Sequence, residues 1–460
     1  MTTVQTDNSI PQQDHKRTGI FVTSILILFI MLNYSNEWDY NITSIDQRDI
    51  LSSDKVASSQ SHNGLSTDQS RTGADGKQKK DKEDQKTSAM GQKREKNIAL
   101  DISFVGDIMV HDPQIVSADT GSGYDFTPWF EYVKKYISKS DLAICNLETT
   151  FAGNPYTGYP LFSSPDELAL GLKNAGFDVA TTTNNHTMDK GIYGVKRTVR
   201  ILEKSGIQVS GTQRKKEDKD YLVKDVNGVK VGIVAATYET DQVSGNRTLN
   251  GNRMDEKASQ LVNSFGFQSL SEDMKKYKRN IKDARNDGAE VIIAYLHWGD
   301  EYDVEPNKRE KRIAKKIAGY GADIILASHP HVLQKKSVIT VGEGDDEREV
   351  PVFYSMGNFI SNQRSENNSS RYVEQGIIAQ TKITYDKSEK EIQSIQTGYI
   401  PTWVDKYYGP GDLEYAVIPL VDDYENNPML IKSGHVNNAK QARSDIRKRI
   451  GKSEKINIFK

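Results

Sequence analysis

The chain has 460 residues, of which 27% are charged and 36% hydrophobic, so it has room for two or three average domains or for one large α/β domain with appendages. Its formal net charge of -2 gives no whole-chain basis for binding nucleic acid, and we expect no nucleic-acid partner. Cys145 is the only cysteine, which excludes an internal disulfide framework, and its apolar neighbours predict a buried thiol rather than a nucleophile.

An uncharged apolar run follows Lys16 and Arg17 near the start of the chain, from Gly19 to Leu32. Counted as residues 18–34, it makes a helix of roughly 25 Å, slightly short of a hydrocarbon core but long enough to cross it with flanking side chains at the interfaces. No small-residue cleavage site follows, so we expect a retained transmembrane signal anchor, with a cleaved signal peptide as the alternative.

The charges around this run predict its orientation. Basic residues precede it and acidic residues follow it, so residues 1–17 are expected to stay in the cytoplasm and the rest to be exported. Residues 35–96 are rich in Ser, Gln, Lys, Asp and Gly and offer little apolar surface to bury, which predicts a flexible extracytoplasmic linker. The main domain is therefore expected outside the cell membrane, held by a single pass.

From residue 97 onward, apolar runs of strand type alternate with runs of helical periodicity. This alternation is typical of a largely parallel sheet covered by helices, and so of an α/β fold. Asn227-Gly228 lies between two β-rich runs and predicts a hairpin, while 239–263 reads as an insertion or long loop. Later runs read as antiparallel strands of a second sheet, and the tail beyond 422 as a solvated basic helix. The expected elements are strands 98–105, 141–145, 178–183, 290–296, 323–328, 350–355, 376–385 and 393–400, and helices 126–138, 164–175, 192–205, 270–287 and 305–318.

Polar residues cluster just after the carboxyl ends of these strands, where open α/β sheets place their sites. His329-Pro330-His331 follows a buried strand, and two imidazoles one residue apart can point into one cleft. The alternative is that one histidine caps the strand and the other is exposed. Acidic, amide and imidazole groups suit a pair of divalent cations with a bridging carboxylate. The candidates are Asp107, Glu148, Asn185, His186, His297, His329 and His331.

Six short motifs between residues 98 and 385 resemble, in order, those of the CapA/PgsA family of poly-γ-glutamate capsule biosynthesis proteins. That family is related to the calcineurin-like metallophosphoesterases. The motifs are Gly106-Asp107-Ile108-Met109, Asn146-Leu147-Glu148, Asn184-Asn185-His186 with Asp189 and Gly191, HWGDEY from His297, SHPHVLQ from Ser328 and YSMGNF from Tyr354.

The resemblance implies a four-layer αββα sandwich over residues 97–400, followed by a C-terminal extension, 401–460, with a basic tail. It also implies a site at the edge of the two sheets that holds Mn, Zn or Mg. The implied roles are first-metal ligands Asp107 and His331, a bridging Glu148, second-metal ligands Asn185, His297 and His329, His186 as proton donor, and Asp300 and Glu301 supporting His297.

The chain departs from the phosphoesterase pattern at two positions. Met109 stands where those enzymes have a histidine, and a thioether binds a divalent cation poorly, so one metal position is expected to be weak or empty unless His111 replaces it. Ser328 stands where glycine usually precedes the histidine pair. Met109 is also the best argument for a scaffold with a vestigial site.

Two functions follow from these features. The resemblance implies an accessory subunit for synthesis and export of poly-γ-glutamate, with a membrane-bound ATP-dependent ligase and a small multispan membrane protein as partners. The chain has no phosphate-binding loop of the G-x-x-x-x-G-K-S/T type and is not expected to activate glutamate itself. The alternative is an extracytoplasmic metal-dependent hydrolase of phosphoesters or of the polymer's amide bonds.

Overall fold

The computed structural model describes residues 97–344, 347–368, 370–409, 413–451 and 454–459. The predicted anchor, 18–34, and the predicted linker, 35–96, lie outside the described residues. None of the helices in the described ranges is long and apolar enough to cross a membrane.

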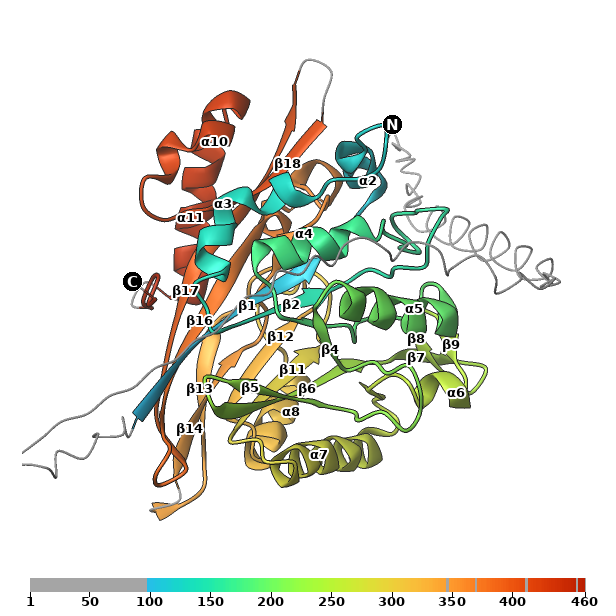
Figure 1. The fold of residues 1–460 in the computed structure, drawn as a ribbon, viewed down its shortest axis with the longest axis vertical. Coiled ribbons are helices and arrows are strands. Elements are labelled where there is room, and N and C mark those ends of the chain that lie inside the picture. The colour runs from blue at the N-terminus through green and yellow to red at the C-terminus, as the bar shows by residue number, and fades with distance from the viewer. Residues whose placement is uncertain (1–96, 345–346, 369, 410–412, 452–453, 460) are drawn as a thin grey trace, which may run out of the picture. The chain divides into compact units, whose positions relative to one another are not determined.

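The first sheet joins the N-terminal strand to strands from the end of the domain (Figure 1). Its strands are β1 (Asn97–Ile108), β2 (Leu142–Leu147), β3 (Val179–Thr181), β4 (Gln208–Ser210), β15 (Asn358–Ile360), β16 (Gln375–Asp386), β17 (Glu391–Tyr408) and β18 (Leu413–Pro419). Their order is β18-β17-β16-β1-β2-β3-β4, with β15 beside β1. Strands β1 to β4 run parallel, whereas β16 to β18 pair antiparallel.

The second sheet has the order β10-β6-β11-β12-β14-β13, with β5 paired to β6. Its strands are β5 (Leu222–Val226), β6 (Val229–Tyr238), β10 (Ser264–Phe265), β11 (Val291–His297), β12 (Ile324–Ser328), β13 (Lys336–Val341) and β14 (Arg348–Phe353). A small separate sheet is formed by β7 (Thr240–Val243), β8 (Asn246–Leu249) and β9 (Asn252–Met254). The region 239–263, expected as a loop or insertion, therefore contains this sheet and a short helix, α6 (Glu256–Ser259).

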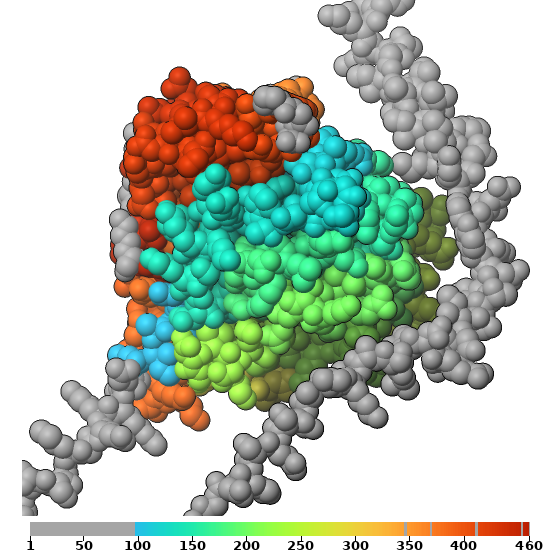
Figure 2. Space-filling model, turned by 45° about the horizontal axis from the view of Figure 1, so that its top comes forward, coloured from blue at the N-terminus to red at the C-terminus, as the bar shows by residue number. Residues whose placement is uncertain are grey.

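Helices flank the two sheets, which confirms the predicted mixed α/β fold. They are α2 (Asp112–Ala118), α3 (Thr127–Ile137), α4 (Glu167–Ala175), α5 (Gly191–Lys204), α7 (Leu270–Asn286), α8 (Lys308–Gly319), α9 (Ser365–Asn368), α10 (Pro428–Ser433) and α11 (Val436–Ile450), with 3₁₀ turns η2 (Arg371–Glu374) and η3 (Tyr424–Asn426). Figure 2 shows the early segments in cyan and green forming one face of the molecule beside the red C-terminal segment.

Three apolar clusters show how these elements stack. One lies between the sheets and joins Ile102 and Phe104 of β1 to Ile233 of β6 and Ile293 of β11. A second packs α3 and α4 against the outer face of the first sheet, and a third packs α7 and α8 against the outer face of the second. Because each buried aliphatic or aromatic side chain contributes about 1.5–3 kcal/mol, the sheets are fixed against each other, and so are their strand ends.

Of the late strands predicted as antiparallel strands of a second sheet, β14 lies in the second sheet, whereas the membership predicted for β16 and β17 is wrong. Strands β16 and β17 extend the first sheet, because β16 pairs along β1 from Asn97 to Val105, a contact between distant segments that local patterning does not encode. The predicted domain boundary after residue 400 falls inside β17. Beyond it, α10 and α11 supply Leu430 and Ile446 to the cluster between the sheets, so this segment packs into the same core.

The hairpin prediction at Asn227-Gly228 is confirmed. Val226 pairs with Val229 across the turn, and Asn227 and Gly228 have φ of 55° and 83°, as a two-residue hairpin with both central residues left-handed requires. Cys145 is buried and free, as expected, and burial raises the pKa of its thiol.

Candidate metal centre

The His-Pro-His segment follows β12 in an unusual backbone conformation. His329 and His331 have φ of 112° and 58°, both in the region that favours glycine, and both side chains are buried. Such residues cost about 1–3 kcal/mol each and collect where a site needs a fixed geometry. The His331 imidazole lies at the end of β1, with its Nδ1 3.2 Å from Asp107 Oδ2, and the backbone N–H of His329 donates to the same oxygen at 3.4 Å.

Asp107 is held at the end of β1 by its neighbour on β2. Asn146 Nδ2 donates a hydrogen bond of 2.7 Å to Asp107 Oδ1, so one carboxylate oxygen is fixed while the other faces His331. The β1–β2 register shifts between Val105 and Asp107, at the point where the two strands reach the site. Parallel pairing thus places the two polar side chains side by side.

Glu148 is the most informative residue of the cluster. It follows β2, it is 0% exposed, and neither of its carboxylate oxygens has a hydrogen-bond partner among the described residues. Oε1 lies 3.6 Å from His297 Nε2 and 3.9 Å from His331 Nε2. A buried carboxylate without a donor carries a large desolvation cost, and that cost is removed when a cation binds.

His297, Asn185 and His329 converge on the other side of Glu148. His297 Nε2 lies 2.9 Å from Asn185 Oδ1 and 3.1 Å from His329 Nδ1. Tyr238, at the end of β6, places its hydroxyl 3.0 Å from His329 Nε2. Three potential ligand atoms, His297 Nε2, Asn185 Oδ1 and His329 Nδ1, thus lie close together and come from the ends of three different strands.

The ionisation of the cluster is set by burial and by mutual charge. Burial lowers the pKa of His297 to about 3. Burial, together with the charges of neighbouring histidines, lowers the pKa of His329 well below its usual value. Burial and the Asp107 carboxylate raise the pKa of Glu148. For Asp107 and His331 burial is outweighed by their hydrogen bond, which lowers the pKa of Asp107 and raises that of His331. His297 and His329 are therefore neutral at pH 7, as ligands must be.

His186 forms a dyad beside the cluster. Its Nδ1 lies 2.8 Å from Asp189 Oδ2, and its Nε2 lies 3.4 Å from Asn250 Nδ2. The Phe162 ring packs edge-on against the imidazole at a centroid distance of 4.6 Å. The carboxylate favours the tautomer with hydrogen on Nδ1 and leaves Nε2 as the exchangeable end.

The structure thus brings together all six predicted metal ligands, with the predicted proton donor next to them. Within the described ranges, two groups of three residues have ligand atoms within 4.8 Å of one another, and both groups contain Glu148. The groups are Glu148, His329 and His331, and Asp107, Glu148 and His297. The role of each ligand at a particular ion stays a prediction.

Asp300 and Glu301, predicted to support His297, are exposed, and no contact between them and His297 is found in the described part of the chain. Asp300 instead accepts a hydrogen bond from Asn307 Nδ2 at 3.1 Å, at the start of α8. The group near His297 Nδ1 is Asn146, whose Nδ2 lies 3.5 Å away.

Met109 and His111, the two residues at the position of the missing histidine, make contacts with residues other than the candidate ligands. Met109 is buried, and its sulfur accepts a hydrogen bond of 3.7 Å from Ser361. His111 faces Gln114 and the Phe162 ring, and burial lowers its pKa to about 4. Neither residue is in the two ligand groups.

Sequence reasoning left three contributors unassigned. Asn146 and Asn358 lie in motifs that the resemblance included, and Asn358 Oδ1 is 3.0 Å from His331 Nδ1. An amide shortly after a predicted strand was the available signal for both. Tyr238 had no local signal, because only the sheet pairing brings the end of β6 beside β12 through β11.

The donor set fits a divalent cation. It consists of imidazole nitrogens, carboxylate oxygens and an amide oxygen, and the only cysteine lies elsewhere in β2 with its sulfur 3.7 Å from Val179 O. Such a mixed nitrogen and oxygen set suits Mn, Zn or Fe and is less specific for Mg. The unpartnered Glu148 oxygens are the observation that carries this fit.

Comparison with known proteins identifies the family. The model of the family described as "Bacterial capsule synthesis protein PGA_cap" matches residues 101–363. This range is more than half of the chain and includes every candidate ligand. The chain belongs to this family.

Curated relatives in the family agree. The chain is 29% identical over 296 residues to the capsule biosynthesis protein CapA of Bacillus anthracis, a match that covers 61% of this chain and 64% of the relative. It is 30% identical over 275 residues to the PGA biosynthesis protein CapA of Bacillus subtilis strain 168, covering 57% and 64%. The matches thus span slightly less than two thirds of the length of these relatives.

Solved structures resemble the chain only distantly. A phosphatase of Mycoplasma pneumoniae matches with a TM-score of 0.35 and 14% identity, covering 66% of this chain and 94% of that one. The sulfate thiohydrolase SoxB of Thermus thermophilus matches with a TM-score of 0.33 and 13% identity, covering 76% and 60%. Likeness at this level carries no inference about activity.

Proposed function

We propose that this chain is a membrane-anchored accessory subunit for the synthesis and export of poly-γ-glutamate, and that it works on the outer face of the cell membrane with a divalent-metal site. Membership of the capsule synthesis family supports the pathway. The single observation that carries the metal-dependent role is the buried, unpartnered Glu148 among three histidines. The stacking of two sheets between helices is compatible with the four-layer αββα sandwich that the family resemblance implies.

The residues proposed to hold metal are Asp107, Glu148, Asn185, His297, His329 and His331. A bound cation would neutralise and polarise the carboxylate or phosphate oxygens of a substrate. The protein's own contribution is to keep the imidazoles neutral by burial, to fix Asp107 through Asn146, and to exclude water around Glu148.

The remaining elements of the proposal concern location and partners. The apolar run 18–34 supports a single-pass anchor with the N-terminus in the cytoplasm and the main domain outside. The proposed partners are a membrane-bound polyglutamate synthase ligase, a small multispan membrane subunit and the polymer itself. The chain would handle the emerging polymer, with metal ions screening its carboxylates.

A specific observation favours a second function, metal-dependent hydrolysis of a phosphoester or of the polymer's amide bonds. His186 is a buried imidazole oriented by Asp189 beside the proposed ligands, and this is the arrangement of a general acid. Its Nε2 is free of any carboxylate among the described residues, and a His186 imidazolium, protonated on both ring nitrogens, would give its Nε2 proton to a leaving group and return to the tautomer with hydrogen on Nδ1.

The test starts with elemental analysis of the full-length chain and of a His329→Ala/His331→Ala variant, followed by polyglutamate and phosphodiester hydrolysis assays. Metal that is lost in the variant, without turnover in the wild type, supports the accessory role. Turnover that falls in a His186→Gln variant with unchanged metal content supports hydrolysis. Absence of metal from the wild type after incubation with Mn, Zn and Mg contradicts the metal site.

A second arm tests the pathway. In a Bacillus subtilis strain that lacks its own CapA, this chain should restore polymer production, and the double histidine variant should not. Failure of the wild-type chain, when it is present in the membrane at a normal level, contradicts the accessory function. A chain that restores production equally well with both histidines removed acts as a scaffold only.

A further inference from the structure

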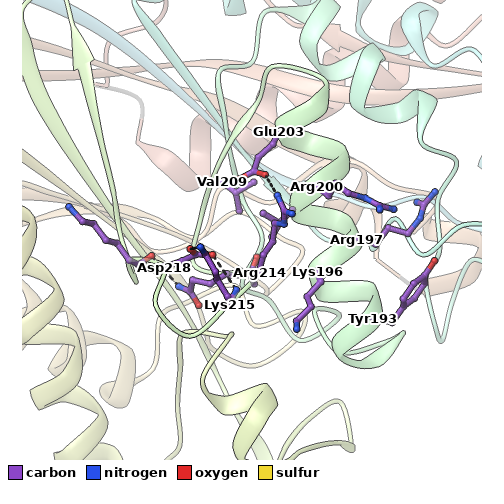
Figure 3. A pocket seen from close by; sticks show the side chains of 13 residues that line it. Tyr193, Lys196, Arg197, Arg200, Glu203, Val209, Arg214, Lys215 and Asp218 are labelled. Carbon is purple, nitrogen blue, oxygen red and sulfur yellow. Dashed lines mark hydrogen bonds and ion pairs between the residues drawn. The ribbon is translucent and has the colours of Figure 1, made fainter. Parts of the chain in front are cut away.

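A basic pocket of about 670 Å³ lies outside the metal centre, between α5 and the segment 212–219 (Figure 3). Six basic side chains line it, against two acidic ones. The basic residues are Lys196, Arg197, Arg200, Arg214, Lys215 and Lys219. An excess of positive charge around a hollow attracts anions from solution.

Two of these cations have no counter-ion among the residues that the structure describes. Lys196 and Arg200 are exposed, lie one turn apart on α5, and make no ion pair or side-chain hydrogen bond within the described part of the chain. Like charges at this spacing repel, which mildly destabilises the helix. An anion bound between them would reverse that effect.

The other cations of the pocket are already paired. Arg197 makes a two-pronged pair with Asp166 at 2.6 and 2.9 Å, and Arg214 pairs with Glu203 at 3.1 Å. Lys196 and Arg200 are therefore the groups available to a ligand.

A buried polar group at the same pocket also lacks a partner. Gln213 lines the pocket and is only 4% exposed. Its Nε2 donates to Lys219 O at 3.5 Å, whereas its Oε1 has no donor among the described residues. A buried acceptor without a donor is unfavourable, and a ligand with an N–H group would remove that cost.

The pocket is connected to the metal centre through the chain between β2 and α4. Arg197 Nη1 donates to Phe151 O at 3.0 Å, at one end of this segment. At its other end Phe162 packs on His186, and its N–H donates to Asp189 Oδ2 at 2.8 Å. Contacts along this segment therefore link Arg197, a residue of the pocket, to the His186 dyad.

We infer that the basic pocket binds a segment of an acidic polyamide, with side-chain carboxylates on Lys196 and Arg200 and a main-chain N–H on Gln213 Oε1. A polymer of glutamate repeats both groups, whereas a phosphate polymer has the charge but no amide N–H. The inference rests on the proposed function for the identity of the polymer, but it concerns a site that shares no residue with the metal cluster.

The test measures binding of a fluorescent γ-linked oligoglutamate to the full-length chain by anisotropy. The Lys196→Ala/Arg200→Ala variant should bind roughly five- to tenfold more weakly, since each exposed charge contact contributes modestly. The matched control is Arg312→Ala/Lys316→Ala, which removes the same charges at the same spacing from exposed positions on α8. That control should bind as the wild type does.

Two further comparisons separate the parts of the inference. Gln213→Ala should weaken oligoglutamate and leave inorganic polyphosphate of equal charge unaffected, because only the polyamide has an N–H group. If the double variants on α5 and α8 lost oligoglutamate affinity equally, the binding would be non-specific charge attraction, and the proposed site would be overturned. Unchanged binding in the Lys196 and Arg200 variant would also overturn it.

Metal content, measured in the same samples, keeps the two proposals distinguishable. Normal metal content with no oligoglutamate binding refutes the pocket and leaves the metal site intact. Pocket binding in a chain that takes up no metal refutes the metal site and leaves the pocket intact.

Discussion

Glu148 Oε1 lies 3.6 Å from His297 Nε2, and neither side chain is exposed to solvent. A carboxylate and a neutral imidazole at this distance, without a hydrogen bond between them, leave space between their donor atoms that suits a shared cation. Burial lowers the pKa of His297 to about 3 and raises that of Glu148, so the metal-free pair bears an electrostatic cost. A substitution that removes this cost should therefore lower the affinity for metal and raise the stability of the metal-free protein.

Glu148→Gln should therefore abolish metal binding and raise the stability of the metal-free protein by about 1 kcal/mol, because it removes a buried ionisable group that has no hydrogen-bond partner in the described part of the chain. Elemental analysis and urea unfolding in chelator measure the two effects. The control is Glu310→Gln, since Glu310 is also buried with an unpartnered Oε1 and a pKa raised by burial to about 7. That variant should keep its metal, and a Glu148→Gln protein that also keeps its metal would contradict the site.

The strained backbone at His329 predicts that glycine is more stable than alanine at this position, the reverse of the usual order. With φ of 112° at this position, His329→Gly should be more stable than His329→Ala by about 1–2 kcal/mol, measured without metal. At His297, the last residue of the regular strand β11, the order should reverse, because glycine there only adds chain entropy to the unfolded state. The same order at both positions would show that the His329 backbone relaxes.

Stability of the metal-free protein should depend on His111 below neutral pH. Burial lowers the pKa of His111 to about 4, whereas in the unfolded chain it is about 6.5. Between these values the unfolded state binds more protons, so this stabilising contribution is complete above pH 6.5 and is lost as the pH falls toward 4.

The measurement is the change in unfolding free energy between pH 7 and pH 5 in chelator. His111→Gln should reduce that change by about 1–2 kcal/mol, because it removes one titrating group. If the variant had the same pH dependence as the wild type, His111 would have the same pKa in the folded and the unfolded protein, which would contradict the prediction.

Asp189→Asn should change the tautomer of His186 without changing metal content. The carboxylate holds hydrogen on Nδ1 at 2.8 Å, and an amide in its place no longer selects that tautomer electrostatically. Nitrogen NMR of labelled histidine reports the tautomer directly. The control Asp166→Asn breaks only the Arg197 pair and should leave His186 as it is.

Local patterning predicted much of the scaffold of this protein. Strand and helix periodicity anticipated β1, β2, β11 and β12 and the helices α3, α4, α5, α7 and α8, because these elements are decided by the burial of one face or by a buried run. The turn at Asn227-Gly228 was predictable since its backbone needs residues that tolerate a left-handed conformation. The six ligand candidates were visible as polar residues at the ends of apolar strands.

Only the tertiary structure decided how distant segments meet. The pairing of β16 with β1 assigned the late strands to the first sheet, and packing of β6 beside β11 brought Tyr238 to His329. Likewise, the support of Asp107 and His331 by amides became visible only once both sheets were placed. The physical reason is the same throughout: propensity and periodicity act over a few residues, whereas register, burial of charge and the partners of a polar group depend on chain segments far apart in sequence.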